Sequence, residues 1–84
     1  MITKTYYERS PWASIEVHDT PQLVTFTEFG EHLPNEGIDH EAQGRFIVFN
    51  HVTGTRQAFE SWAAADGRRA EMAQRYAALD RAFR

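Results

Sequence analysis

The sequence predicts an α+β fold: a small antiparallel sheet, made of an N-terminal strand and two hairpins, with one C-terminal helix packed on one face. Before residue 60, short segments rich in β-branched and aromatic residues alternate with turn-forming residues. From residue 61 onward, apolar residues instead recur at intervals of three and four, which is typical of a helix with one buried side. We expect residues 1–84 to form a single domain.

The first strand is expected at residues 2–7, which are mostly β-branched or aromatic, and Pro11 follows its end. Residues 13–18 alternate between apolar and polar side chains, the pattern of a half-buried strand. Asp19, Thr20 and Pro21 are a turn signal. We therefore expect residues 22–29 to fold back on residues 13–18 as the first hairpin.

Residues 30–44 predict a long loop. They contain Pro34, Asn35 and three glycines, together with four acidic residues and two histidines. Long irregular loops are uncommon in small domains and are often functional. After this loop, the continuous apolar run RFIVFN at 45–50 predicts a central strand, and residues 51–54 turn the chain toward a partner strand at 55–59.

The C-terminal helix is expected to begin after Ser61, a suitable N-cap residue. Asp66 and Gly67 either lie inside this helix, at a cost of about 1 kcal/mol for the glycine, or separate a short first turn from a main helix that Asp66 caps. The apolar stripe of the helix consists of Trp62, Ala65, Met72, Tyr76, Leu79 and Phe83. The expected core consists of Ile15, Val17, Phe26, Phe46, Val48, Phe59, Trp62, Met72, Tyr76 and Leu79.

Both faces of the sheet carry apolar side chains. In the run 45–50, Phe46 and Val48 point one way while Ile47 and Phe49 point the other. One helix covers only one face, so the second face needs another cover. The N-terminal segment and the long loop are one candidate, and a partner or a second copy of the chain is the other.

Composition restricts the classes of protein to which the chain can belong. It has no cysteine, which excludes disulfides, thiolate zinc sites and a thiol nucleophile, and which fits a reducing compartment. The N-terminal residues lack the apolar core of a signal peptide, and no apolar run is long enough to span a membrane. We expect a cytoplasmic domain that does not contact membranes.

Charge is distributed very unevenly along the chain, although the formal net charge is only −3. No lysine or arginine lies between Arg9 and Arg45, whereas arginines outnumber acidic residues from residue 43 onward. Such polarity favours encounter with a basic surface. The acidic segment contains seven carboxylates: Glu16, Asp19, Glu28, Glu31, Glu36, Asp39 and Glu41.

Catalytic and metal-binding patterns are weak. His32 and His40 lie among carboxylates that suit zinc, manganese or iron, but their spacing matches no metal-binding template. The candidate acid/base pairs are Glu28 with Glu31, or Asp39 with His40. No serine lies in a nucleophile elbow. We expect neither enzymatic activity nor a metal or other cofactor, and we keep a metal-dependent enzyme built on the loop as a minor alternative.

Arginines of the expected helix raise the alternative of nucleic-acid binding. Arg68 and Arg75 share a helix face, whereas Arg81 lies nearly opposite. Glu71 is placed to pair with Arg75, as Asp80 is with Arg84. Because no continuous basic stripe results, we do not expect direct DNA or RNA binding. A small dimeric DNA-associated regulatory domain that uses this helix remains the second hypothesis.

The small acidic chain and its hairpin-to-helix segment RFIVFNHVTGTRQAFESWAAADGRRAEM resemble the small inhibitor proteins of phages and mobile elements, in particular anti-CRISPR proteins. The resemblance implies a protein that binds a surveillance complex and blocks its nucleic-acid-binding surface. It rests on no residue-specific motif and therefore assigns no site residues. The part TGTRQAFESW also resembles the hairpin-to-helix passage of small arm-type DNA-binding domains, from which the acidic first half departs.

The leading hypothesis is therefore a non-enzymatic inhibitor or adaptor, either a monomer or a homodimer. It presents its seven carboxylates to a lysine- and arginine-rich protein surface, such as a CRISPR effector subunit. Affinity in such interfaces comes mainly from a few buried aromatic anchors. The candidate anchors are Tyr7, Trp12 and Phe29.

Overall fold

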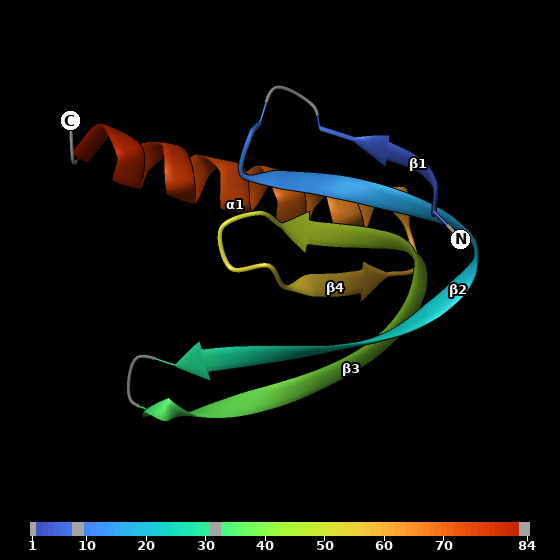
Figure 1. Ribbon diagram of the computed structural model, residues 1–84, viewed down its shortest axis with the longest axis horizontal. Coiled ribbons are helices and arrows are strands. Elements are labelled where there is room, and N and C mark those ends of the chain that lie inside the picture. The colour runs from blue at the N-terminus through green and yellow to red at the C-terminus, as the bar shows by residue number, and fades with distance from the viewer. Residues whose placement is uncertain (1, 8–9, 31–32, 83–84) are drawn as a thin grey trace.

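The computed structural model describes residues 2–7, 10–30 and 33–82, and at 28–30, 33–36 and 38 it describes the backbone alone. The chain forms β1 (Ile2–Tyr6), β2 (Ala13–Gly30), β3 (Leu33–Asn50), β4 (Arg56–Phe59) and α1 (Trp62–Ala82). The strands form one antiparallel sheet in the order β1-β2-β3-β4, and α1 packs on one of its faces (Figure 1). This arrangement confirms the predicted α+β fold.

Two of the predicted elements are wrong. Residues 13–29 do not form a hairpin, because β2 is one strand of 18 residues that continues through the predicted turn at 19–21. Residues 30–44 are not a loop either, because 33–44 are the first part of β3 and pair with the second part of β2. The first hairpin therefore joins β2 to β3. Pro21 is tolerated because it lies in a bulge, where it need not donate a hydrogen bond to a partner strand.

The bulge also bends the long hairpin. Val17 pairs with Phe46, and the next register pair is Gln22 with Gly44, so four residues of β2 lie opposite Arg45 alone. The longer path on β2 makes the pair of strands curve away from the sheet (Figure 1). The Arg45 side chain bridges the bulge, since its Nε donates to the carbonyl oxygen of His18 at 3.2 Å.

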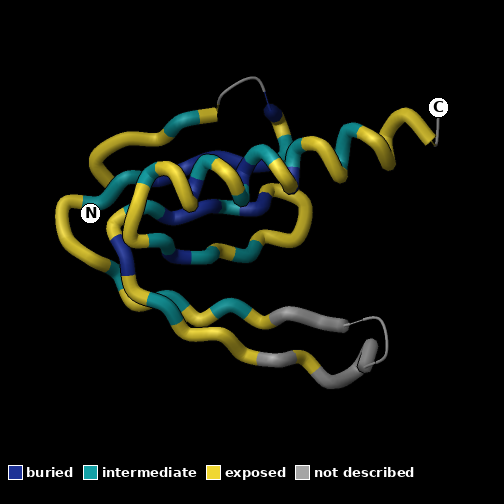
Figure 2. The backbone as a smooth tube through the Cα atoms, turned by 180° about the vertical axis from the view of Figure 1, so that it is seen from behind, coloured by how far each residue is buried: buried dark blue, intermediate teal, exposed yellow. Residues whose placement is uncertain are grey.

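We call residues 22–30 and 33–44 the ribbon, and the rest of the chain the body. The ribbon curves back so that it passes the free edge of β4 (Figures 1 and 2). Gly44, at its base, is buried, and a side chain there would overlap the carbonyl group of Phe59. Glycine at this position therefore permits the close approach of the bend to the end of β4.

Helix α1 runs without interruption through Gly67, so the alternative of two separate helical segments is wrong. Ser61 caps it as predicted, because its Oγ accepts the backbone N–H of Ala64 at 3.2 Å. Its buried residues pack on the sheet residues predicted to lie beneath them. The core consists of Ala13, Ile15, Val48, Ala65 and Met72, with Tyr6, Val17, Phe46, Phe59, Trp62 and Tyr76 partly buried around it.

Leu79 is the exception in the predicted core. It is 48% exposed, because α1 is longer than the sheet beneath it and its last turns extend into solvent (Figure 2). Phe26 is half-buried and lies on the ribbon rather than in the core cluster. Phe83 lies outside the described residues.

The sheet face opposite the helix is closed by the chain itself at its centre. Ile47 is only 1% exposed, and it shares a hollow of about 190 Å³ with Gln22, Leu23 and Val24 of the ribbon. Phe49 is half-buried beside His51 and Arg56. The centre of this face is therefore buried within the chain itself. Among the described residues, no helix is long and apolar enough to cross a membrane.

Candidate functional site

The ribbon carries most of the predicted acidic site. Residues 22–44 contain five carboxylates and neither lysine nor arginine: Glu28, Glu31, Glu36, Asp39 and Glu41. The sequence placed four of these on a loop, whereas the structure places four of the five on the two strands of one projecting element (Figure 1). Glu31 lies outside the described residues, and the side chains of Glu28 and Glu36 are not described.

Asp39 and Glu41 are the two ribbon carboxylates whose side chains are described, and both are exposed. They lie two residues apart on β3 and therefore on the same face of the ribbon. Thr27, the register partner of Asp39, donates its hydroxyl to the Asp39 carboxylate at 2.6 Å. The two carboxylates lie on the same face of the ribbon as the exposed Thr25 and Thr27 of β2, and we call this the outer face of the ribbon.

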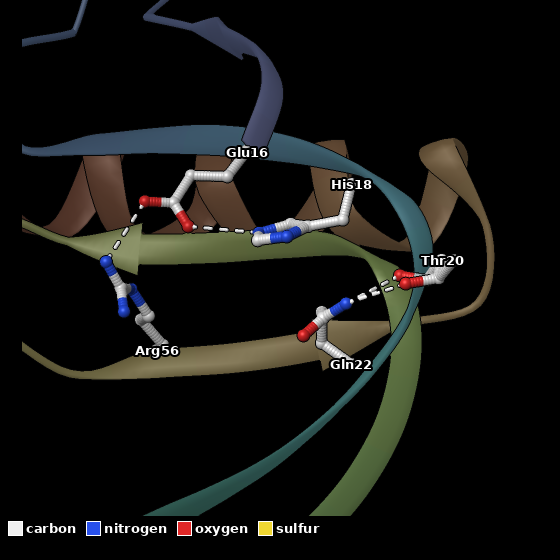
Figure 3. A network of polar contacts seen from close by, with 5 residues as sticks. All are labelled: Glu16, His18, Thr20, Gln22 and Arg56. Carbon is white, nitrogen blue, oxygen red and sulfur yellow. Dashed lines mark hydrogen bonds and ion pairs between the residues drawn. The ribbon is translucent and has the colours of Figure 1, made fainter. Parts of the chain in front are cut away.

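Glu16 was predicted to lie on the docking surface, and this prediction is wrong. The residue is 6% exposed. One of its carboxylate oxygens accepts from Nη2 of Arg56 at 3.3 Å, while the other lies 3.4 Å from Nε2 of His18 (Figure 3). The alternation of β2 correctly turned Glu16 away from the helix, but the neighbouring strand and the returning ribbon cover that face. Glu16 therefore ties β2 to β4.

The same view shows how the bulge is held. Gln22 points back toward Thr20, and its Nε2 donates to the Thr20 carbonyl at 3.0 Å and to the Thr20 hydroxyl at 3.1 Å (Figure 3). Asp19, the remaining predicted acid, is exposed, and its carboxylate accepts the Thr3 hydroxyl from β1 at 2.6 Å. Asp19 thus lies on the body, at the bend, and apart from the ribbon carboxylates.

Two of the three predicted aromatic anchors, Tyr7 and Trp12, lie on the body and not among the ribbon acids. Tyr7 is 57% exposed and stacks on His51, with ring centroids 5.8 Å apart. Trp12 is half-buried, and its carbonyl oxygen accepts the His51 backbone N–H at 2.8 Å. The Phe29 side chain is not described. The apolar side chain that does lie beside the acids is Leu23, which is 65% exposed on the outer face of the ribbon.

A serine and a histidine meet at the end of the sheet. Nε2 of His51 lies 3.0 Å from Oγ of Ser14, the spacing of a nucleophile and its base. Ser14 is 1% exposed, however, so this hydroxyl is closed to substrate and its contact with His51 satisfies a buried polar group. Phe49 packs edge-on against the same imidazole, at 4.7 Å between centroids, and holds the His51 ring in place.

Metal-binding chemistry has little support in the part of the chain that the structure describes, since no group of three or more His, Asp or Glu side chains there is placed to hold an ion. His40 is exposed on the ribbon, and His32 lies outside the described residues. The proposed His32–His40 site thus falls partly beyond the structure.

The helix arginines are partly engaged in ion pairs, and one of the two expected pairs is wrong. The other was Asp80 with Arg84, and Arg84 lies outside the described residues. Glu71 pairs with Arg68 at 3.0 Å rather than with Arg75. Arg69 is buried, with its Nη2 2.9 Å from the Asp66 carboxylate. Arg81 donates to the Ala77 carbonyl. These contacts restrain Arg68, Arg69 and Arg81 against the helix, which leaves no continuous basic stripe along its described residues.

A second hollow, which the sequence did not predict, lies between the ribbon, the β3–β4 turn and α1. It has a volume of about 420 Å³, and its lining includes Phe26 of the ribbon, Thr55 of the turn and Tyr76 of the helix. These residues are far apart in the sequence, so only the bend of the ribbon brings them together. No sequence motif spans such a set.

The chain matches no protein-family model, no curated protein and no solved structure.

Proposed function

We propose that this chain is a non-enzymatic binding protein that docks its acidic ribbon on a lysine- and arginine-rich surface of another protein. The observation that carries the proposal is the concentration of five carboxylates, without a lysine or arginine, on residues 22–44. The described part of this range, 22–30 and 33–44, forms a projecting two-stranded element. A charged protrusion reaches a partner before the rest of the surface does. Its field therefore steers encounter and fixes orientation.

Exposure supports the outer face of the ribbon as the contact surface. Leu23, Thr25 and Thr27 are exposed on β2 and pair directly with Gln43, Glu41 and Asp39 of β3. Directly opposite residues of an antiparallel pair point to the same side, so these six form one face. Leu23 gives this face an apolar contact point beside the acids.

The target class that we propose is a nucleic-acid-binding protein, whose binding surface must be basic to hold phosphates. An acidic ribbon on that surface excludes the nucleic acid and inhibits the protein. The general resemblance to anti-CRISPR proteins makes a CRISPR effector subunit the first target to test. Such a target places the action of the protein in the cytoplasm.

Charge reversal on the ribbon tests this proposal. The double variant Asp39→Lys, Glu41→Lys changes the charge of the outer face by four units and alters only exposed side chains. The matched control Glu60→Lys, Asp80→Lys makes the same change at two exposed positions of the body. Each protein is expressed in bacteria with an active CRISPR system, and phage plating is measured.

We expect the wild type and the control to restore plating and the ribbon variant to lose this effect. Circular dichroism checks that each variant is folded. If the ribbon variant protects phage as well as the wild type does, while Arg68→Glu with Arg75→Glu abolishes protection, the helix is the functional surface and the ribbon is not.

A further inference from the structure

Three side chains around the hollow between the ribbon and α1 have hydrogen-bond donors for which the described part of the chain provides no acceptor. This hollow is lined by Phe26, Arg68, Met72, Arg75 and Tyr76, among others. Its lining, as far as the structure describes it, includes no aspartate or glutamate. Its volume of about 420 Å³ falls within the range of small-molecule sites.

The Tyr76 hydroxyl is one of these groups. It accepts a hydrogen bond from Nδ2 of Asn50 at 2.9 Å. The orientation of the Asn50 amide is fixed, because its Oδ1 accepts the backbone N–H groups of Val52 and Thr53 at 2.9 and 3.1 Å. Asn50 is itself only 6% exposed. No described residue accepts the Tyr76 O–H, so this proton is available to a ligand.

The two arginines add further donors. Nη1 of Arg68 donates to the Glu71 carboxylate, whereas the buried Nε of Arg68 has no acceptor among the residues that the structure describes. Arg75 lies two helical turns further on the same face, is exposed, and forms no ion pair within the described ranges. Among the described side chains there, Arg68, Arg75 and Glu71 together carry one net positive charge. A hollow with surplus donors favours a ligand that brings acceptors and negative charge.

We propose that this hollow binds a small organic oxyanion, a phosphate or carboxylate attached to an apolar or flat body. Arg75 and the Tyr76 hydroxyl hold the oxyanion, while Phe26 and Met72 contact the body of the ligand. Guanidinium and phenolic O–H groups are strong donors to phosphate and carboxylate oxygens. Phe26 belongs to the ribbon and Met72 to the helix, so the ligand contacts both parts and restrains the angle between them.

Titration by two-dimensional NMR of the labelled full chain tests the site. The probes are phenyl phosphate, benzoate, inorganic phosphate and neutral phenol. We expect saturable shifts at Phe26, Thr55 and Arg75 with at least one of the two aromatic anions, and weaker binding of inorganic phosphate and phenol. The tighter aromatic anion identifies the oxyanion. If neither aromatic anion saturates, or if inorganic phosphate binds as tightly as the better one, the proposal is wrong.

A matched pair of helix variants locates the binding. Arg75→Gln removes an exposed charge at the hollow. Arg81→Gln removes an exposed charge on the same helix, from a side chain that donates to the Ala77 carbonyl. Removing a hydrogen bond to a charged group lowers the affinity by roughly tenfold or more. We expect that loss for Arg75→Gln and wild-type affinity for Arg81→Gln. Equal effects of the two variants would show that the anion responds to general helix charge and would overturn the site.

Discussion

Gly44→Ala should prevent the ribbon from bending against the body. A methyl group at this position would overlap the carbonyl carbon and oxygen of Phe59 and lie 3.0 Å from the backbone nitrogen of Glu60. These are backbone atoms at the junction between β4 and α1, so no side-chain rotation relieves the overlap. Either the bend opens or β4 is displaced from the core.

The size of the effect follows from these contacts. Overpacking a closed site costs about 1–3 kcal/mol, and occasionally more when backbone must move. We expect a loss of about 3 kcal/mol in the free energy of unfolding. Domains of this size have a total stability of about 4–13 kcal/mol, and each kcal/mol shifts the melting temperature by about 4–8 °C. The midpoint should therefore fall by more than about 10 °C.

Urea unfolding followed by circular dichroism measures this loss, and the same substitution elsewhere is the control. Gly67 lies inside α1, and no described atom beyond its chain neighbours and the backbone of the helix itself lies within 4 Å of the place that a Cβ would occupy. Gly67→Ala should therefore stabilise the protein by about 1 kcal/mol. Opposite signs for the two alanine variants are expected. A Gly44→Ala protein within about 0.5 kcal/mol of the wild type would show that the bend does not rest on β4.

Two further predictions concern the packing of the body. Met72→Ala should cost about 2–4 kcal/mol because this side chain is 5% exposed, whereas Leu79→Ala, at 48% exposure, should cost less than about 1 kcal/mol in the same urea assay. Glu16→Ala should cost about 1–3 kcal/mol, because it deprives Arg56 and His18 of a buried carboxylate partner. Asp19→Ala, at an exposed carboxylate, is its control, and equal losses would contradict the buried role of Glu16.

Local patterns were enough to predict the helix and the second hairpin. The three- and four-residue spacing after Ser61 and the apolar run at 45–50 each depend on neighbouring residues only, and the structure places helix α1 and the β3–β4 hairpin there. The same spacing could not show where the helix outgrows the sheet. For that reason Leu79 was assigned to the core although it projects beyond it.

The long hairpin was not predictable in the same way. Pro21 and Gly44 are turn signals in isolation, yet in the fold they are the two sides of one bend, where β2 takes extra residues and β3 passes close to β4. That bend is a tertiary feature. It also explains Glu16, whose outward orientation followed from alternation but whose burial depends on the folded sheet and the returning ribbon.

The most direct test of the docking proposal is retention of a target by immobilised protein. Lysate of a CRISPR-bearing host is incubated separately with three immobilised proteins, and retained proteins are quantified by mass spectrometry. The three are the wild type, the ribbon variant Asp39→Lys with Glu41→Lys, and the control Glu60→Lys with Asp80→Lys. We predict that wild type and control retain a nucleic-acid-binding protein, that added duplex DNA competes with it, and that the ribbon variant loses it. Retention that survives reversal of the ribbon charge and is insensitive to DNA would contradict the proposal.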